Sequence, residues 1–474
     1  MALANFTTLD GTGLELSDEL IDGLRAEVRG DVLTAEDAGY DEARRIWNGM
    51  HDRHPALIVR CTGTADVVAA VNFARDYGLL LSVRGGGHNV AGNSMVDGGL
   101  AIDLSPMKGI LVDPARCLAR VQPGATWGDL DRETQLHSLV TPGGQVSTTG
   151  VAGFTLSGGM GMTHRKFGLT CDNLASAQIV TADGNVVTAS EAEHPDLFWA
   201  IRGGGGNFGV VTSFEFRLHE FGPEAVTATT IYPATHGVDI LRKWRAYTES
   251  APDEVTSMAV LWSLPPLPNV PPELHGNPII VIHAMYGGPV GDGQQVLQPL
   301  RELAEPVLDM SAVAPYVQLQ SSFDVFYPEG GLYYWKSLFL EELTDTLIER
   351  MISQLHDRPS LETNLFLRHL GGAMSRVPED ATPYANRSAL YNMSIDGKWS
   401  DPAQSSENID WVRNAWEQLS ELSGGGVYLN FAGFGEDTDK LARAGFGGNY
   451  ERLRTVKRQY DPMNLFRTNV NIKP

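Results

Sequence analysis

The sequence predicts an α+β protein built from more than one domain. Its 474 residues exceed the usual size of a single hydrophobic core, and its 42% hydrophobic content is typical of a globular chain. Short strand and helix patterns alternate up to a turn at 221–223, after which four strand candidates are interleaved with long helix patterns. We therefore expect a first domain over 1–222, a second over 223–424, and a segment over 425–474 that returns to complete the first.

The first region begins with a short apolar strand over 57–60. A helix over 66–77 follows, because its apolar residues recur at helical spacing, Thr64 precedes it as a cap and Gly78 ends it. Strands are expected over 79–83, 100–104, 110–112 and 118–121, and a helix over 127–139. The pair Asp183-Gly184 predicts a hairpin between strands 177–181 and 186–188. A helix over 195–201 then leads through glycines to a strand over 210–218.

The middle region predicts an antiparallel sheet covered by helices. Its strand candidates are 227–232, 256–262, 279–285 and 365–370. Its helix candidates are 239–249, 343–355 and 409–422. The last helix, 450–460, is stopped by Asp461-Pro462.

Charge and composition exclude several classes of function. The chain has 58 acidic and 36 basic residues, a formal charge of −22, so it lacks the basic character that nucleic acid binding needs. No apolar run approaches the length of a membrane span, and the first residues do not resemble a secretory signal. Three cysteines without metal-ligand spacing favour a disulfide-free cytoplasmic protein with no metal site.

One glycine-rich loop gives the strongest indication of a ligand. A predicted strand ends at 83, and Arg84, three glycines at 85–87, His88 and Asn89 follow it. Glycines let the backbone approach a ligand closely and let successive N–H groups converge on a diphosphate. The imidazole at the end of the loop can then reach the group that the diphosphate carries.

A second glycine run is not a dinucleotide fingerprint. Residues 204–209 match G-x-G-x-x-G by letter, but a Rossmann fingerprint lies between a strand and the helix that it opens. Here a predicted helix precedes the glycines and a strand follows them. The sequence also contains no Walker A motif, so a bound diphosphate would be held by another architecture.

Five blocks of sequence carry a family resemblance. They are 84–88, the glycines between 143 and 161, 166–173, 206–211 and 460–471. In this order they resemble the berberine-bridge-enzyme-like branch of the vanillyl-alcohol-oxidase superfamily, the flavin-linked oxidases. The resemblance covers most of 50–220 and returns over 425–474. It implies a PCMH-type FAD-binding domain of two α/β subdomains, and a substrate domain with an antiparallel sheet covered by helices.

The same resemblance implies that FAD lies between the two subdomains, with its flavin 8α-methyl bonded covalently to His88. Such a bond would fix the ring and make it more electron-poor, which favours hydride acceptance. The residues expected around the cofactor are Arg84, Gly85, Gly86, Gly87, His88, Asn89, Gly143, Gly144, Ser147, Thr148, Gly150, Gly153, Gly158, Gly161, Asn173, Val211, Asn469 and Asn471.

A second covalent link is not expected. Relatives with two links carry a cysteine in the second glycine block, where this chain has Val146. We therefore expect a single histidyl link, as in relatives similar to 6-hydroxy-D-nicotine oxidase. Cys171 lies further along and is expected to be a small buried thiol.

The resemblance also suggests catalytic residues. Hydride transfer from an alcohol needs a base for the departing proton. Residues 427–431 resemble the family's Tyr-x-Asn-aromatic strand, so Tyr428 and Asn430 are candidates, with a packed structural tyrosine as the alternative. Tyr391 and the aromatics at 333–335 are candidates for the pocket wall. Sugar-oxidising relatives have a second tyrosine where this chain has Met160, which weakens a carbohydrate assignment.

The predicted strand 365–370 bears on the substrate charge. Amine-oxidising relatives place carboxylates on this strand, but neither of its alternating faces carries an acid here. A cationic substrate would meet Arg368, so amines are disfavoured. Arg368 is expected either to orient an anionic or carbonyl-rich substrate or to form a structural ion pair.

Together these features predict a cytoplasmic FAD-dependent oxidase. It would transfer hydride from a small alcohol-bearing or aromatic substrate to the flavin, and dioxygen would be reduced to hydrogen peroxide. The alternatives are a dehydrogenase of the same fold with poor oxygen reactivity, an amine or sugar oxidase, and a flavin-binding protein without turnover. The sequence leaves open whether the chain is monomeric or a homo-oligomer.

Overall fold

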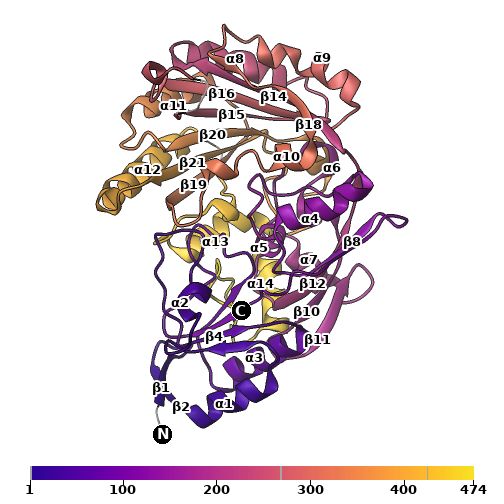
Figure 1. Cartoon of the computed structure of the whole chain (residues 1–474), viewed down its shortest axis with the longest axis vertical. Coiled ribbons are helices and arrows are strands. Elements are labelled where there is room, and N and C mark those ends of the chain that lie inside the picture. Colours follow the sequence, from indigo (N-terminus) through magenta and orange to yellow (C-terminus); the bar gives the residue numbers. More distant parts are fainter. Residues whose placement is uncertain (1–2, 267–269, 424) are drawn as a thin grey trace.

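Three main β-sheets organise the chain into two stacked parts (Figure 1). The computed structural model describes residues 3–266, 270–423 and 425–474. The lower part in Figure 1 holds both chain ends and two smaller sheets, and the upper part holds one large sheet with helices on its outer side. This arrangement is the predicted α+β architecture.

The first small sheet supports the glycine loop. Its order is β3 (Asp31–Leu33), β4 (Leu57–Arg60), β6 (Leu100–Asp103) and β5 (Leu81–Arg84), with β4, β6 and β5 parallel. The helices α1 (Asp18–Glu27) and α3 (Thr64–Asp76) contribute apolar side chains to its core. A hairpin of β1 (Leu3–Thr7) and β2 (Gly13–Ser17) precedes it, and α2 (Tyr40–Ala43) follows β3.

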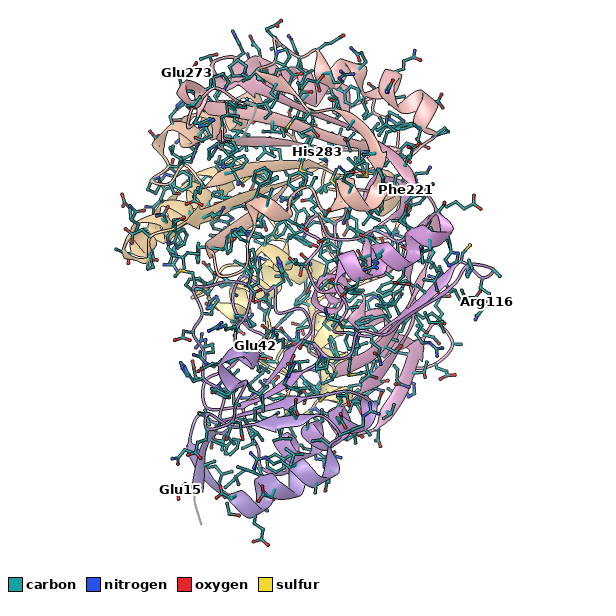
Figure 2. The ribbon with its side chains drawn as sticks, viewed as in Figure 1. Glu15, Glu42, Arg116, Phe221, Glu273 and His283 are labelled. Carbon is teal, nitrogen blue, oxygen red and sulfur yellow. The ribbon has the colours of Figure 1, made fainter. Side chains whose placement is uncertain are left out.

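The second small sheet is antiparallel. Its order is β11 (Val186–Ser190), β10 (Leu174–Val180), β12 (Val210–Arg217), β8 (Leu118–Val121) and β7 (Ile110–Asp113). Arg116 lies at the outer tip of the β7–β8 hairpin (Figure 2). The helices of this region are α4 (Trp127–Thr134), α5 (Val151–Leu156), α6 (His164–Phe167) and α7 (Pro195–Ile201).

The large sheet begins just after Phe221, which Figure 2 marks where the chain enters the upper part. Its strands are antiparallel neighbours in the order β17 (Leu308–Asp309), β14 (Glu224–Pro233), β16 (Pro278–Tyr286), β15 (Val255–Ser263), β20 (Asn364–His369), β21 (Tyr391–Trp399) and β19 (Leu332–Leu340), and β18 (Ala312–Pro315) also pairs with β14. The helices of this part are α8 (Gly237–Thr248), α9 (Val290–Arg301), α10 (Tyr316–Gln320), α11 (Asp345–Asp357) and α12 (Ser405–Ser420).

The two faces of the large sheet have different roles. Alternate residues such as Leu365, Leu367 and Ile395 are buried with the covering helices in one apolar core. The residues between them, such as Phe366, face the lower part and pack in a second cluster with Trp47. The inner face of the sheet is therefore available to form a wall of a site between the two parts.

The C-terminal segment returns to the lower part, where α13 (Thr438–Phe446) and α14 (Tyr450–Tyr460) pack on the second small sheet's core. Lys457 at the end of α14 is fully buried, and its Nζ donates to the Asp461 carboxylate at 2.7 Å. The same carboxylate accepts the N–H groups of Leu465 and Phe466. This buried pair fixes the turn that leads into the last residues of the chain.

Several predicted elements need correction. The helix expected over 127–139 ends at Thr134, because Ser138 adopts a φ of 53° and β9 (Leu139–Val140) pairs with the distant β13 (His219–Glu220). Thr64 is the first residue of α3 rather than its cap, since Gly63 holds the N-cap position without a side-chain bond. The strand β21 was not predicted.

The domain limits at 222 and 424 remain predictions. All strands of the large sheet fall between them, but Gly424 lies outside the described residues. Among the helices that the structure describes, none combines the length and the apolar character that crossing a bilayer requires.

Asp461→Ala should destabilise the protein by about 3–5 kcal/mol, because it leaves the buried Lys457 ammonium without its carboxylate, with only the Asn207 and Phe466 carbonyls as acceptors. A fall in the thermal unfolding midpoint checks this. Lys108→Gln, which removes the exposed 3.3 Å pair with Asp129, should cost less than about 1 kcal/mol. Equal shifts for both variants would contradict the role of the buried pair.

Candidate active site

A cavity of about 460 Å³ lies between the glycine-rich loops of the lower part and the inner face of the large sheet. This volume is typical of sites for small molecules and cofactors. The lower wall comes from residues within 85–91, 144–146, 149–157, 205–211 and 467–470. The upper wall comes from side chains of β19, β20 and β21 together with the segment 429–438.

The glycine loop and the second glycine block meet through their backbones. An added Cβ on Gly86 would lie 2.5 Å from the Gly150 Cα, and one on Gly150 would lie 2.5 Å from the Gly86 nitrogen. Only glycine permits this approach at either position. Gly153 differs, because a Cβ there would meet no described atom within 4 Å and the residue lines the cavity. The loops thus present bare backbone to a ligand.

His88 lies at the end of the glycine loop in the cavity wall. Its Nε2 is 3.1 Å from the hydroxyl oxygen of Thr148 in the second glycine block. Removal of the imidazole from bulk water lowers the pKa of His88 to about 3. The ring is therefore neutral at physiological pH and retains a nitrogen lone pair.

Ten of the predicted cofactor residues line the cavity. They are Gly85, Gly86, Gly87, His88, Asn89, Gly144, Gly150, Gly153, Val211 and Asn469. Two cationic side chains that the sequence did not single out, Arg53 and Arg467, line the same cavity. Arg467 belongs to the block 460–471, so its positive charge was a usable signal.

The other predicted cofactor residues lie outside the cavity wall, and their contact with the cofactor stays a prediction. They are Arg84, Gly143, Ser147, Thr148, Gly158, Gly161, Asn173 and Asn471.

Three of these residues make hydrogen bonds that hold neighbouring segments in place. The Arg84 guanidinium donates to the Ala43 carbonyl at 2.6 Å, and the Asn173 amide donates to the carbonyls of Phe167 and Leu169. Ser147 donates its N–H and its hydroxyl to the Asp324 carboxylate, at 2.7 and 2.5 Å.

Three glycines outside the wall contact protein instead of open space. A Cβ on Gly143 would lie 2.7 Å from the Trp127 ring, one on Gly158 would lie 2.4 Å from the Tyr384 ring, and one on Gly161 would lie 2.2 Å from a backbone carbonyl. They are needed for close packing of the loops. Asn471 is half-buried near the C-terminus, and its buried Oδ1 has no hydrogen-bond partner among the described residues.

Tyr428 lies behind the wall and is not in a strand. It precedes the short 3-10 helix η8 (Leu429–Phe431). Its hydroxyl accepts the Met160 N–H at 3.1 Å and the Asn430 amide at 2.8 Å, and both of these partners line the cavity. Burial raises the pKa of Tyr428 to about 12, so the phenol stays protonated. The structure therefore favours the interpretation of Tyr428 as a packed structural tyrosine, and it places Asn430 in the cavity wall.

Arg368 and Asp396 form a buried charged pair at the upper wall. Their side chains are 3.9 Å apart, both line the cavity, and the Ser394 hydroxyl donates to Asp396 at 2.6 Å. The Arg368 guanidinium lies between the rings of Phe366 and Phe431, at 4.4 and 4.6 Å. Burial raises the pKa of Asp396 to about 6, although the Arg368 charge opposes the shift.

Asp396 corrects the charge prediction for the upper wall. The strand 365–370 itself has no acid, but β21 lies beside it, with Asn364 opposite Asp396 in register. The sequence signal was available, since Asn392, Ser394 and Asp396 alternate with apolar residues. A cationic group entering the cavity would meet a carboxylate as well as Arg368.

Tyr391 was predicted to line the pocket, and its position corrects that prediction. It begins β21 on the face covered by helices, in the same core as Trp244. Its hydroxyl is 2.6 Å from that of Thr248 on α8. Of the aromatics at 333–335, Trp335 lines the cavity, whereas Tyr334 faces the helices.

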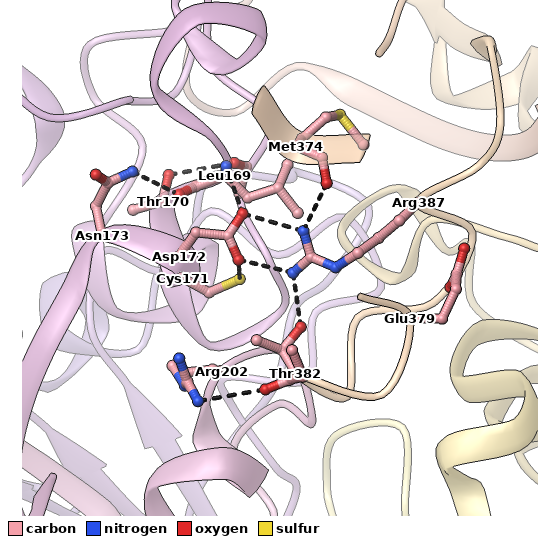
Figure 3. A network of polar contacts seen from close by, with 12 residues as sticks. Leu169, Thr170, Cys171, Asp172, Asn173, Arg202, Met374, Glu379, Thr382 and Arg387 are labelled. Atoms are coloured by element: carbon pink, nitrogen blue, oxygen red, sulfur yellow. Dashed lines mark hydrogen bonds and ion pairs between the residues drawn. The ribbon is translucent and has the colours of Figure 1, made fainter. Parts of the chain in front are cut away.

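A buried polar network joins the block 166–173 to a loop of the upper part (Figure 3). Arg387 donates to both Asp172 oxygens, at 2.7 and 3.1 Å, and also to the Met374 carbonyl and the Thr382 hydroxyl. Cys171 lies beside this pair, fully buried, and burial raises the pKa of its thiol. Cys171 is the expected inert thiol, and Val146 lines the cavity.

Comparisons with known proteins agree with this geometry. The family described as FAD binding domain matches residues 55–190, and the family described as berberine and berberine like matches 427–473. The uncharacterized FAD-linked oxidoreductase YgaK of Bacillus subtilis (strain 168) is 31% identical, covering 95% of this chain and 98% of the relative. The chain is a berberine-bridge-enzyme-like FAD-linked oxidoreductase of the vanillyl-alcohol-oxidase superfamily.

Other members of the berberine-bridge-enzyme-like family cover the chain equally fully. The (R)-6-hydroxynicotine oxidase of Paenarthrobacter nicotinovorans is 32% identical over 94% of this chain and 97% of its own length. The crystal structure of 6-hydroxy-D-nicotine oxidase from Arthrobacter nicotinovorans superposes with a TM-score of 0.84, at 29% identity, covering 94% and 98% of the two chains. The enzyme class and the predicted α+β fold class are thereby confirmed.

Gly150→Ala should reduce the flavin content per chain by about tenfold, because an added Cβ would separate the two glycine loops. The φ of Gly150 is −68°, which any residue adopts, so the effect comes from the contact with Gly86. The absorbance ratio of flavin to protein measures it. Gly291→Ala in α9, where a Cβ meets no described atom within 4 Å, is the control and should leave the ratio unchanged. Full flavin content in Gly150→Ala would show that the close backbone approach is dispensable.

Proposed function

We propose that this protein is an oxidase that holds FAD through a single covalent bond to His88 and transfers hydride from a small organic substrate to the flavin. Dioxygen is the proposed final acceptor and hydrogen peroxide the product. The observation that carries the proposal is the position of the neutral His88 imidazole. It lies on a bare glycine backbone in the wall of a cavity that also holds a buried Arg368–Asp396 pair.

The cavity residues fit a flavin dinucleotide. The backbone at Gly86, Gly150 and Gly153 offers N–H groups without side chains in front of them. The Arg467 guanidinium supplies positive charge for a diphosphate, and Arg53, which also pairs with Asp97 at 2.6 Å, lies in the same wall. Bound FAD supplies the hydride acceptor. The protein residues orient it, exclude water and manage the substrate proton.

A neutral imidazole is the form required for the covalent link. A ring nitrogen of His88 forms a bond to the 8α carbon, while the imidazole N–H and the methyl group each lose one proton. The two electrons released with these protons would pass to the bound flavin, and dioxygen would then accept them. Val146 in the cavity wall has no group that could form a second link. Cys171 is buried away from the wall, which further supports a single bond.

Asp396 is the proposed base for the substrate proton. Its carboxylate lines the cavity, and at neutral pH it is ionised because its raised pKa is still only about 6. Arg368 beside it stabilises the ionised form and can orient a carbonyl or hydroxyl oxygen. The rings of Phe366, Phe431, Tyr327 and Trp335 surround the pair, which favours an aromatic substrate that bears a hydroxyl group.

The carboxylate also favours a second candidate, an amine substrate. Asp396 could attract a cation, and one relative is named (R)-6-hydroxynicotine oxidase. Anaerobic addition of a panel of aromatic alcohols and amines tests both candidates, since a substrate bleaches the flavin without any acceptor. If no compound of either class bleaches it, flavin binding without turnover is the better assignment. Slow reoxidation by dioxygen with rapid dye reduction would indicate a dehydrogenase.

The cytoplasmic location remains a prediction, supported by three cysteines that are unpaired in the structure.

Acid precipitation of the purified enzyme should leave the flavin colour with the protein pellet, because a C–N bond survives unfolding. In His88→Ala the flavin should appear in the supernatant. Cys171→Ala serves as the control and should retain its flavin, since this buried thiol forms no link. Free flavin released from the wild-type enzyme would refute the covalent bond.

Asp396→Asn should slow anaerobic flavin reduction by about 10²–10⁴-fold, the range for loss of a general base. In the wild-type enzyme the carboxylate must be ionised to accept a proton, so the reduction rate should fall as the pH drops through about 6. The variant should lack this dependence. Glu362→Gln on the partly exposed Lys398 pair is the matched control. A wild-type rate and pH profile in Asp396→Asn would exclude Asp396 as the base.

A further inference from the structure

Trp47 lies directly behind His88 in a stack of three rings. The Trp47 and His88 ring centroids are 4.3 Å apart with their planes inclined by 17°. On its other face Trp47 stacks on Tyr333 of β19, at 4.0 Å and 8°. Trp47 is nearly fully buried, and Tyr333 is fully buried. The imidazole thus rests on an aromatic support that extends from the lower part into the upper part.

The backbone around Trp47 is bonded to both parts of the molecule. The Trp47 N–H donates to the Gly87 carbonyl in the glycine loop, at 3.1 Å, and the Trp47 carbonyl accepts the Gly330 N–H at 2.8 Å. The Asn48 amide donates to the carbonyls of Val90 and Tyr333, at 2.6 and 3.0 Å. These bonds fix the segment between the loop that carries His88 and the strand that carries Tyr333.

The side chains of the stack are also held at their edges. The Trp47 indole N–H donates to the Tyr327 carbonyl at 3.0 Å, and the Tyr333 hydroxyl donates to the Pro328 carbonyl at 2.7 Å. Thr148 contacts His88 Nε2 from the second glycine block. The stack sets the plane of the imidazole, and Thr148 sets its rotation within that plane. Together they restrict the orientation of the ring.

From this geometry we propose that Trp47, supported by Tyr333, is a positioning residue that orients His88 for covalent attachment of FAD. The inference rests on the proposed histidyl link. A fixed ring lowers the entropic cost of bringing its nitrogen to the 8α carbon, and small errors in such placement slow a reaction by large factors. Trp47 itself is not part of the cavity wall, so it acts through His88.

The test compares Trp47→Leu with Trp47→Phe, which keeps an aromatic face. Each variant is incubated with added FAD in air, and total and acid-stable flavin per chain are measured over time. Trp47→Leu should bind flavin but convert it to the acid-stable form about tenfold more slowly than the wild type. Trp47→Phe should convert it at close to the wild-type rate. A wild-type rate in Trp47→Leu would overturn the proposal.

Tyr333→Leu and Tyr333→Phe give the answer if Trp47→Leu fails to fold. Loss of the ring in Tyr333→Leu should slow the conversion, and Tyr333→Phe should restore most of the rate. An unchanged rate in Tyr333→Leu would overturn the proposal.

Trp411→Leu on α12 removes a partly buried tryptophan far along the chain and controls for general destabilisation. If the wild type itself releases all its flavin in acid, the histidyl link fails and the positioning role fails with it. Slow conversion in Trp411→Leu as well would point to a merely structural effect.

Discussion

The backbone contact between Gly86 and Gly150 is the constraint on which the site depends. It brings the end of β5 against the start of α5, so that His88 and Gly153 reach the same cavity. The upper part of the molecule forms hydrogen bonds to the second glycine block. The Asp324 carboxylate accepts from Ser147, and the Gln320 amide donates to the Gly144 carbonyl. The cofactor cradle is therefore shaped by both parts of the chain.

The inner face of the large sheet contributes the chemistry opposite this cradle. Asp396 is buried, and the Arg368 charge offsets only part of the desolvation that raises its pKa. A paired carboxylate with a pKa near 6 is ionised at neutral pH yet close enough to neutrality to exchange a proton. Tyr428, by contrast, uses its hydroxyl to hold Met160 and Asn430 in the wall. The acid and the tyrosine have separate roles.

Much of this organisation could be predicted from the sequence. The glycine loop ending in His88, the hairpin at Asp183-Gly184 and the alternating faces of the strand 365–370 are local patterns, and the structure contains all three. Three covering helices of the large sheet, α8, α11 and α12, were also predicted from periodic apolar runs, whereas α9 was missed.

The remaining features depend on contacts between distant segments. β21 was missed because its polar residues alternate with apolar ones up to Gly397, a pattern also typical of an exposed strand. Its buried place in the sheet comes from pairing with the distant strands β19 and β20. Tyr391 was assigned to the pocket because nothing local shows which face of its strand meets the helices. Asn173 and Ser147 belong to motifs of the resemblance, but here they secure loops through Phe167 and Asp324. A sequence motif indicates that a residue matters, and the contacts in the structure show its role.

Peptide mapping of the digested enzyme by mass spectrometry tests the role of His88 most directly. The peptide that contains His88 should carry the mass of FAD, and the peptides that contain Val146 and Cys171 should be unmodified. An unmodified His88 peptide from yellow, flavin-loaded enzyme would contradict the covalent attachment on which the proposed oxidase rests.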